Sequence, residues 1–215
     1  MKYFAYDLSV DGIVNELYDM KRSGMLSYPL LLTESGRQEL LTNIKLAQHL
    51  FTPAAAVYGV TKQNMNTLYL DNNDLSKLPE ELRASLNGFR QEYNVVHQQI
   101  AKKAKFKIKD FNSIGIHQYP LGAEGIAPHR DFKQSVNLIT IFVLEGWAPV
   151  YSCKDRTLEG AVAVDRSPGT VIFMRAARNE KEQEYRPFHA VGAVNEERYS
   201  LIFRTDDLSL SADKK

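Results

Sequence analysis

Cysteine is nearly absent from this chain, because Cys153 is the only one among its 215 residues. One cysteine excludes an intrachain disulfide and suits a reducing compartment, so we expect a cytoplasmic protein. It also disfavours a structural zinc site, which is usually rich in cysteine. The sequence shows no apolar stretch long enough for a signal peptide or a membrane-spanning helix, so we expect no membrane partner.

An excess of charge of either sign is also lacking. Lys and Arg total 27, Asp and Glu total 26, and the formal net charge is +1. This balance gives no general attraction to nucleic acid, so we expect a small-molecule partner and leave the oligomeric state open. The densest basic run, from Lys102 to Lys109, is explained adequately by solvation of a helix end and protection of an edge strand.

The chain is long enough for a full core, with 44% hydrophobic residues, and we expect a single domain. Residues 1–105 are predicted to be a mainly helical region, 106–206 a β-rich core, and 207–215 a frayed tail. Apolar spacing and capping residues predict helices over 10–21, 35–50 and from Pro79 to Ile100. The last of these is expected to bury its apolar stripe against a sheet.

Eight strands are predicted after residue 105, which is the number that a jelly roll needs. The predicted fold class is therefore α+β, a cupin-like jelly roll with the helical region packed on one sheet. The strands are expected over 106–108, 113–119, 137–144, 150–152, 160–164, 170–174, 188–194 and 198–204. A turn at Ser167-Pro168-Gly169 is expected to lead into the strand at 170–174.

The triplet His129-Arg130-Asp131 and the distant His189 are the main candidates for chemistry. On a strand, residues two apart point to the same face, so His129 and Asp131 can reach one metal ion. Two histidines and one carboxylate form the facial triad of non-haem iron sites, which leaves open positions for a co-substrate and dioxygen.

The triplet has two other interpretations. An isolated His-x-Asp occurs often by chance, and a lone histidine is more often structural than a ligand. The run from His129 to Asn137 also resembles a protein-kinase catalytic loop, but its asparagine comes one residue late and no Asp-Phe-Gly or glycine-rich loop accompanies it.

The run from Arg198 to Arg204 alternates as a strand does, with Arg198, Ser200 and Arg204 on one face. Two arginines facing a barrel interior would be costly without anions, and arginine binds carboxylates through two parallel hydrogen bonds. The alternative is an edge strand whose arginines face water, and this run alone favours that alternative.

From Ser113 to Arg204 the chain resembles the Fe(II)/2-oxoglutarate-dependent dioxygenases of the double-stranded β-helix fold. The resemblance implies that His129, Asp131 and His189 hold the iron and are the catalytic residues. It implies further that Arg198 and Ser200 bind the distal carboxylate of 2-oxoglutarate. The cofactors implied are Fe(II), 2-oxoglutarate and O₂.

The ending Arg198-x-x-Leu-x-Phe-Arg204 resembles that of the AlkB-type nucleic-acid demethylases. There a second arginine, here Arg204, lies near the other end of the co-substrate, and an upstream tyrosine, here Tyr119, donates a hydroxyl to it. Those demethylases usually carry Asn two residues before that tyrosine, where this chain has His117.

Our leading hypothesis is an oxygenase that hydroxylates an unactivated C–H bond of a small molecule and releases succinate and CO₂. One alternative is an oxidative demethylase of alkylated nucleobases, for which Tyr58, Tyr69 and Trp147 offer aromatic side chains. A second alternative is a non-catalytic, cupin-like protein that binds a metal or an anion.

Overall fold

The computed structural model describes residues 2–5, 10–19, 24–58, 61–71, 74–103, 110–164, 167–176, 186–207 and 209. The helical segments are α1 (Val10–Asp19), α2 (Glu34–Leu46), η1 (Gln48–Leu50), η2 (Asp74–Lys77) and α3 (Glu80–Lys103). The strands are β1 (Met25–Tyr28), β2 (Thr52–Pro53), β3 (Val57–Tyr58), β4 (Thr61–Asn64), β5 (Asn66–Asp71), β6 (Ser113–Tyr119), β7 (Gly125–His129), β8 (Ser135–Glu145), β9 (Val150–Cys153), β10 (Val162–Val164), β11 (Val171–Arg175), β12 (Phe188–Val191) and β13 (Arg198–Asp206).

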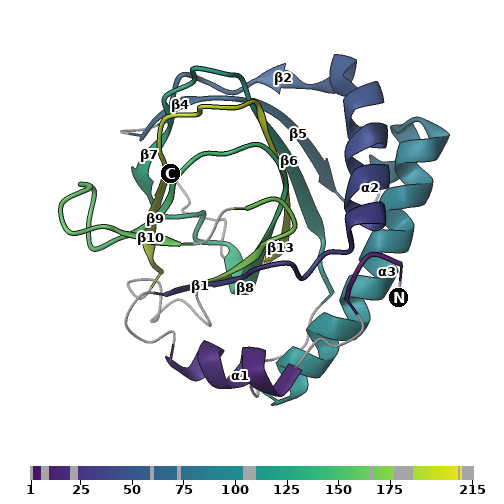
Figure 1. Ribbon diagram of the computed structural model, residues 1–215, viewed down its shortest axis with the longest axis horizontal. Helices are drawn as coiled ribbons and strands as arrows, with labels where there is room; N and C mark the ends of the chain where they lie inside the picture. The colour runs from purple at the N-terminus through teal and green to yellow at the C-terminus, as the bar shows by residue number, and fades with distance from the viewer. Residues whose placement is uncertain are drawn as a thin grey trace.

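These strands form two antiparallel sheets that face each other as a double-stranded β-helix (Figure 1). In the described residues the larger sheet has the order β1-β11-β8-β13-β6-β5-β2 and the smaller one β10-β9-β12-β7-β4-β3. The predicted α+β jelly-roll fold is confirmed.

Strand β13 shows how side-chain alternation separates two hydrophobic cores. Tyr199, Leu201 and Phe203 are buried in a core shared with the helices. Ile202, on the opposite face, belongs to a second core inside the barrel, between the two sheets. The predicted two-faced pattern of this strand is confirmed, and it turns the arginines at its two ends toward the barrel interior.

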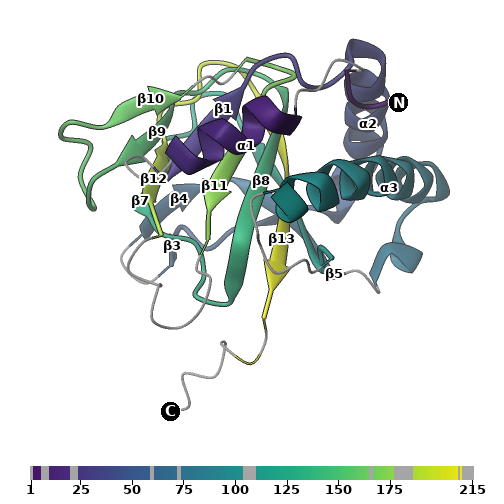
Figure 2. The same ribbon diagram turned by 90° about the horizontal axis from the view of Figure 1, so that it is seen from below.

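Helices α2 and α3 lie together along one side of the barrel (Figures 1 and 2). Phe89 and Tyr93 of α3 pack against Phe142 of β8, with ring centroids 4.8 Å and 4.9 Å apart. The Tyr93 hydroxyl also lies 2.6 Å from the Thr140 hydroxyl. The long helix therefore buries its apolar stripe on the larger sheet, as predicted.

The N-terminal region contributes strands as well as helices, which the sequence analysis did not anticipate. Strands β1, β2 and β5 extend the larger sheet, while β3 and β4 extend the smaller one. The boundary at residue 105 stays a prediction, because 104–109 lie outside the described residues and include the expected strand 106–108 and most of the basic run. Of the tail predicted over 207–215, the described residues include only 207 and 209.

The strand β7 is a further correction, because the eight predicted strands did not include it. It ends at His129, so Asp131 lies two residues beyond the strand. The expected turn before β11 is observed, with Gly169 at a φ of +91°. Among the described residues, no helix has the length and hydrophobicity needed to cross a membrane.

Candidate metal and co-substrate site

Two neighbouring strands of the smaller sheet bring the candidate metal ligands together. His129 on β7 and His189 on β12 are directly paired across the ladder, and their ring centroids are 4.2 Å apart. Asp131 joins them from the segment after β7. One ligand atom from each of the three residues lies within 4.8 Å of the others, so the group could hold a metal ion.

Glycine at position 125 permits the close pairing on which this cluster depends. Gly125 begins β7 with a φ of +81°, where a side chain is disfavoured. A Cβ atom at this position would lie 2.1 Å from the carbonyl oxygen of Val191, on the facing strand. The absence of a side chain therefore allows β7 to approach the strand that carries His189.

The two imidazoles are oriented by main-chain carbonyl groups. Nδ1 of His129 lies 2.9 Å from the oxygen of Ala127, and Nδ1 of His189 lies 3.5 Å from that of Pro187. A proton on Nδ1 that is donated to a carbonyl leaves the Nε2 lone pair available to a metal. Burial and the neighbouring His129 lower the pKa of His189 to about 3, and burial also lowers the pKa of His129. Both rings are therefore neutral at pH 7, as metal ligation requires.

Asp131 is held as a carboxylate by the cations around it. Burial would raise its pKa, but the Arg204 guanidinium is the largest influence that lowers it, and the net shift is downward. Nη2 of Arg204 lies 3.3 Å from Oδ1 of Asp131. Arg186 donates a hydrogen bond to the main-chain carbonyl of Asp131. Arginines therefore fix both the charge and the position of this residue.

The candidate co-substrate residues lie deeper in the barrel. Arg198 faces Tyr119 across the β6–β13 ladder, with its guanidinium carbon 5.4 Å from the centre of the tyrosine ring. Arg198 is 1% exposed, and its Nε has no hydrogen-bond partner in the described part of the chain. Ser200 is buried on the same face of β13. A buried guanidinium whose Nε is unsatisfied by the described residues is the environment that a carboxylate ligand would complete.

His117 lies on β6, which pairs with the strand that carries Arg198, and it lines the cavity beside the metal cluster. It faces Ser200 across the ladder. Its Nε2 lies 3.2 Å from the Tyr69 hydroxyl, and its Nδ1 lies 3.5 Å from the Tyr119 hydroxyl. Burial, together with Arg204, lowers the pKa of His117 to about 3, so the ring is neutral. A neutral imidazole has one donor and one acceptor nitrogen, so the hydroxyl groups on its two sides have opposite hydrogen-bonding roles.

A cavity of about 540 Å³ opens beside the metal cluster. His117, His129, Asp131 and Arg204 line it, whereas Arg198, Ser200 and Tyr119 are not among its lining residues. The structure therefore brings His129, Asp131 and Arg204 to the cavity wall, whereas His189 is not among the residues that line it. It leaves the other three co-substrate residues outside that lining.

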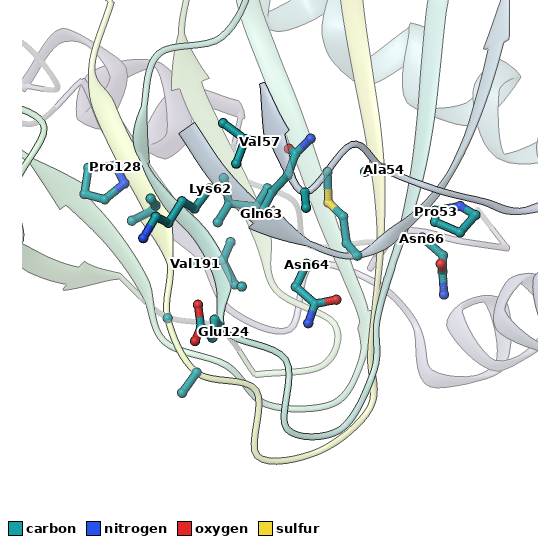
Figure 3. A pocket seen from close by; sticks show the side chains of 18 of the residues that line it. Pro53, Ala54, Val57, Lys62, Gln63, Asn64, Asn66, Glu124, Pro128 and Val191 are labelled. Carbon is teal, nitrogen blue, oxygen red and sulfur yellow. The ribbon is translucent and has the colours of Figure 1, made fainter. Parts of the chain in front are cut away.

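A second depression, of about 720 Å³, adjoins this cavity, and we call it the outer groove. Figure 3 shows the side chains of Lys62, Asn64, Asn66 and Glu124 around it. Ala54, Gln63, Met65 and Ile126 line both the groove and the cavity. The two spaces are therefore neighbours that share one wall.

Sequence reasoning missed most of the cavity wall. Of the aromatic residues suggested for base stacking, Tyr69 lines the cavity and Trp147 does not, while the Tyr58 side chain lies outside the described residues. Tyr69 could have been found from the alternation along β5, because Leu68 and Leu70 pack in the core beneath the helices. No sequence motif includes Arg186, so its place in the cavity wall could not be predicted from the sequence.

The fold just described is that of the double-stranded β-helix oxygenases with known structures. The chain is similar to a prolyl-4-hydroxylase from Pseudomonas putida, with 14% identity, a TM-score of 0.68, and coverage of 92% of this chain and 99% of that one. It is also similar to a Trichoplax adhaerens prolyl hydroxylase that was solved with a hypoxia inducible factor peptide. Here the identity is 13%, the TM-score is 0.70, and coverage is 96% and 93%.

A putative oxygenase from Shewanella oneidensis has the same fold, with 16% identity, a TM-score of 0.62, and coverage of 95% of this chain and 89% of that one. At such identities the likeness shows the fold alone. No family model matches the sequence. No curated protein matches it either.

Proposed function

We propose that this protein is an Fe(II)- and 2-oxoglutarate-dependent oxygenase that hydroxylates an unactivated C–H bond of a small molecule. The observation that carries the proposal is the convergence of the His129, Asp131 and His189 ligand atoms within 4.8 Å of one another. Their residue types fit Fe(II), because two neutral imidazoles and one carboxylate are the ligands of the facial triad. The fold shared with prolyl hydroxylases supports the same conclusion.

The residues around the cavity have distinct proposed roles. His129, Asp131 and His189 would hold the iron, and Arg198 with Ser200 would bind the distal carboxylate of 2-oxoglutarate. The Tyr119 hydroxyl would donate to the co-substrate, and Arg204 would keep Asp131 in position. Bound iron would supply the activation of dioxygen, by which one oxygen atom enters the substrate and the other enters succinate as CO₂ is released.

The protein itself contributes orientation and exclusion of water. Arg204 and Arg186 hold Asp131 from its side chain and from its main chain, respectively. Met65 and Ile126 form an apolar part of the cavity wall. Because the imidazoles are neutral, metal binding displaces no proton from them at pH 7. A volume of about 540 Å³ lies within the usual range for small-molecule pockets.

A second candidate is hydroxylation of a residue within an extended peptide. The outer groove (Figure 3) favours it, because the groove shares the lining residues Ala54, Gln63, Met65 and Ile126 with the cavity. The Trichoplax adhaerens neighbour was solved with a peptide. The demethylase alternative depends on the ending Arg198-x-x-Leu-x-Phe-Arg204, and it requires a nucleic-acid surface that the neutral net charge does not favour.

Oxygen consumption by the purified protein tests the proposed function. We expect slow consumption of O₂ and formation of succinate on addition of Fe(II), ascorbate and 2-oxoglutarate. Mass spectrometry of incubations with amino acids, nucleosides and peptides should then reveal a product heavier by one oxygen atom. Iron and 2-oxoglutarate binding without any succinate would instead support a non-catalytic, cupin-like binding protein.

A further inference from the structure

Four polar side chains, Arg204, Tyr69, His117 and Tyr119, form a continuous line in the larger sheet, and we call them the polar row. His117 is central, because it lies on β6 between strands β5 and β13. Its Nε2 lies 3.2 Å from the Tyr69 hydroxyl, and its Nδ1 lies 3.5 Å from the Tyr119 hydroxyl. The ring is buried and neutral, so one of its nitrogens donates a hydrogen bond while the other accepts one.

The guanidinium of Arg204 lies beside the phenol of Tyr69 and begins the polar row. Gly115 pairs with Tyr69 across the ladder and has no side chain to fill the space above it. A Cβ at Gly115 would lie 3.2 Å from Cε1 of Tyr69 and 3.4 Å from Nη1 of Arg204. Burial raises the pKa of Tyr69, and Arg204 opposes this rise by its charge and by a hydrogen bond. Nη2 of the same guanidinium lies 3.3 Å from Oδ1 of Asp131, so one cation contacts a candidate metal ligand and the phenol.

The direction of each hydrogen bond in the polar row follows from this cation. A guanidinium can only donate, so the Tyr69 oxygen accepts from Arg204 and the phenol hydrogen is directed to Nε2 of His117. The proton of the neutral imidazole is then on Nδ1, which donates to the Tyr119 oxygen. The opposite tautomer would place an N–H group at Nε2, on the side of the Arg204 cation, and polar side chains orient to avoid such an arrangement.

This order of donors leaves the hydrogen of the Tyr119 hydroxyl available to an anion. Tyr119 is 2% exposed, and among the described residues Nδ1 of His117 is the hydrogen-bond partner of its hydroxyl. The guanidinium carbon of Arg198 lies 5.4 Å from the centre of the same tyrosine ring. A carboxylate bound by Arg198 would therefore be close to a hydroxyl that can donate to it. In the opposite order, the Tyr119 hydrogen would be used on His117 and the carboxylate would face only oxygen lone pairs.

We infer that His117 is a positioning residue, which accepts a hydrogen bond from Tyr69, donates one to Tyr119, and thereby directs the Tyr119 hydroxyl hydrogen to the co-substrate. His117 acts on 2-oxoglutarate through Tyr119 and needs no contact of its own with the co-substrate. The use of that hydrogen by 2-oxoglutarate rests on the proposed function, whereas the order of the hydrogen bonds does not.

Nitrogen NMR of the histidine side chains tests this order in the metal-free protein at pH 7. The chain has five histidines, so the two signals of His117 are assigned by their loss in His117→Asn. We expect one signal typical of an N–H group at Nδ1 and one typical of a lone pair at Nε2. A proton on Nε2, an equal mixture of the two tautomers, or a doubly protonated ring would overturn the inference.

Titration calorimetry with 2-oxoglutarate tests the positioning role in Fe(II)-loaded protein without O₂. His117→Leu removes the donor to Tyr119, so the affinity should fall by about three- to ten-fold, as for one neutral hydrogen bond. His117→Asn should retain most of the affinity, because its amide nitrogen is as many bonds from Cα as Nδ1 is. His49→Asn is the matched control, because His49 is exposed on η1, and it should change nothing. An asparagine variant as weak as the leucine variant would contradict the donor role.

A double variant separates action through Tyr119 from a direct contact or a general loss of structure. Tyr119→Phe should itself weaken the binding of 2-oxoglutarate, and adding His117→Leu to it should cause no further loss, because the two groups act as a unit. Losses that multiply in the double variant, or unchanged affinity in His117→Leu, would overturn the inference. A protein that binds neither Fe(II) nor 2-oxoglutarate would refute the proposed function alone, because NMR of the metal-free protein still determines the order of the hydrogen bonds.

Discussion

Arg198 offers a sharp test of how the co-substrate would be bound. Replacement by lysine keeps the positive charge but loses the planar guanidinium group, whose paired N–H groups donate to both oxygens of a carboxylate. Loss of one charge-assisted hydrogen bond in a buried site costs about 1.5–3 kcal/mol, which corresponds to a roughly 10- to 150-fold weaker affinity for 2-oxoglutarate. Titration calorimetry on Fe(II)-loaded protein without O₂ measures this change, and the iron content should stay the same.

The protein without co-substrate gives an independent check on the same residue. Arg198 is 1% exposed and its Nε lacks a hydrogen-bond partner in the described part of the chain, so a polar group of this charged side chain is buried unsatisfied. A buried unsatisfied polar group is destabilising, and its replacement by an apolar side chain of similar size removes that cost. We therefore expect Arg198→Met to retain or increase the free energy of unfolding in the absence of 2-oxoglutarate, while abolishing the stabilisation that 2-oxoglutarate gives the wild type.

Unchanged 2-oxoglutarate affinity in Arg198→Met would refute the assignment. Arg204 would then be the next candidate, because it lines the cavity and Arg198 does not. A large loss of stability in the co-substrate-free Arg198→Met protein would show that Arg198 has a structural role instead.

Three further predictions concern the metal, the strand pairing and the dependence of stability on pH. Asp131→Ala should lower Fe(II) binding to background by metal analysis, and full iron stoichiometry in this variant would exclude the triad. Gly125→Ala should weaken Fe(II) binding and lower the melting temperature, because its Cβ would lie 2.1 Å from the Val191 carbonyl oxygen; an unchanged melting temperature would show that the strands can separate without cost. Burial lowers the pKa of His97 to about 4, against a partial opposing effect of Asp110. The unfolded chain therefore binds a proton at His97 at a higher pH than the folded protein does. As the pH falls from 7 to 4.5, His97 should lower the free energy of unfolding by about 2–3 kcal/mol. His97→Leu should remove that part of the pH dependence in denaturant titrations, and identical slopes for both proteins would contradict it.

The strongly periodic parts of the fold could be predicted from the sequence. The β13 pattern assigned Leu201 and Phe203 to one core and Ile202 to the other, because alternation alone determines the face of a strand. The apolar spacing of α3 identified the stripe that packs on the larger sheet. The short strands β1–β5 were missed, because isolated strands of two to six residues are stabilised mainly by their partners.

The candidate site was predicted in its residue types but not in its arrangement. His129, Asp131 and His189 were identified by their spacing and resemblance, yet the strand β7 that carries His129 was missing from the prediction. Two of its five residues are Gly125 and Pro128, which weaken a strand pattern. The pairing of His117 with Ser200 could not be predicted, because it depends on the register of β6 against β13 and not on local sequence.

Turnover with isotopically labelled dioxygen tests the central claim most directly. The purified protein is incubated with Fe(II), ascorbate, 2-oxoglutarate and labelled O₂, and succinate is analysed by mass spectrometry. We predict succinate that carries one labelled oxygen atom in the wild type and in the exposed control Asp155→Asn, and none above background in Asp131→Ala. Absence of succinate in the wild type, succinate without the label, or equal labelling in Asp131→Ala would contradict the claim that this site is an Fe(II)- and 2-oxoglutarate-dependent oxygenase centre.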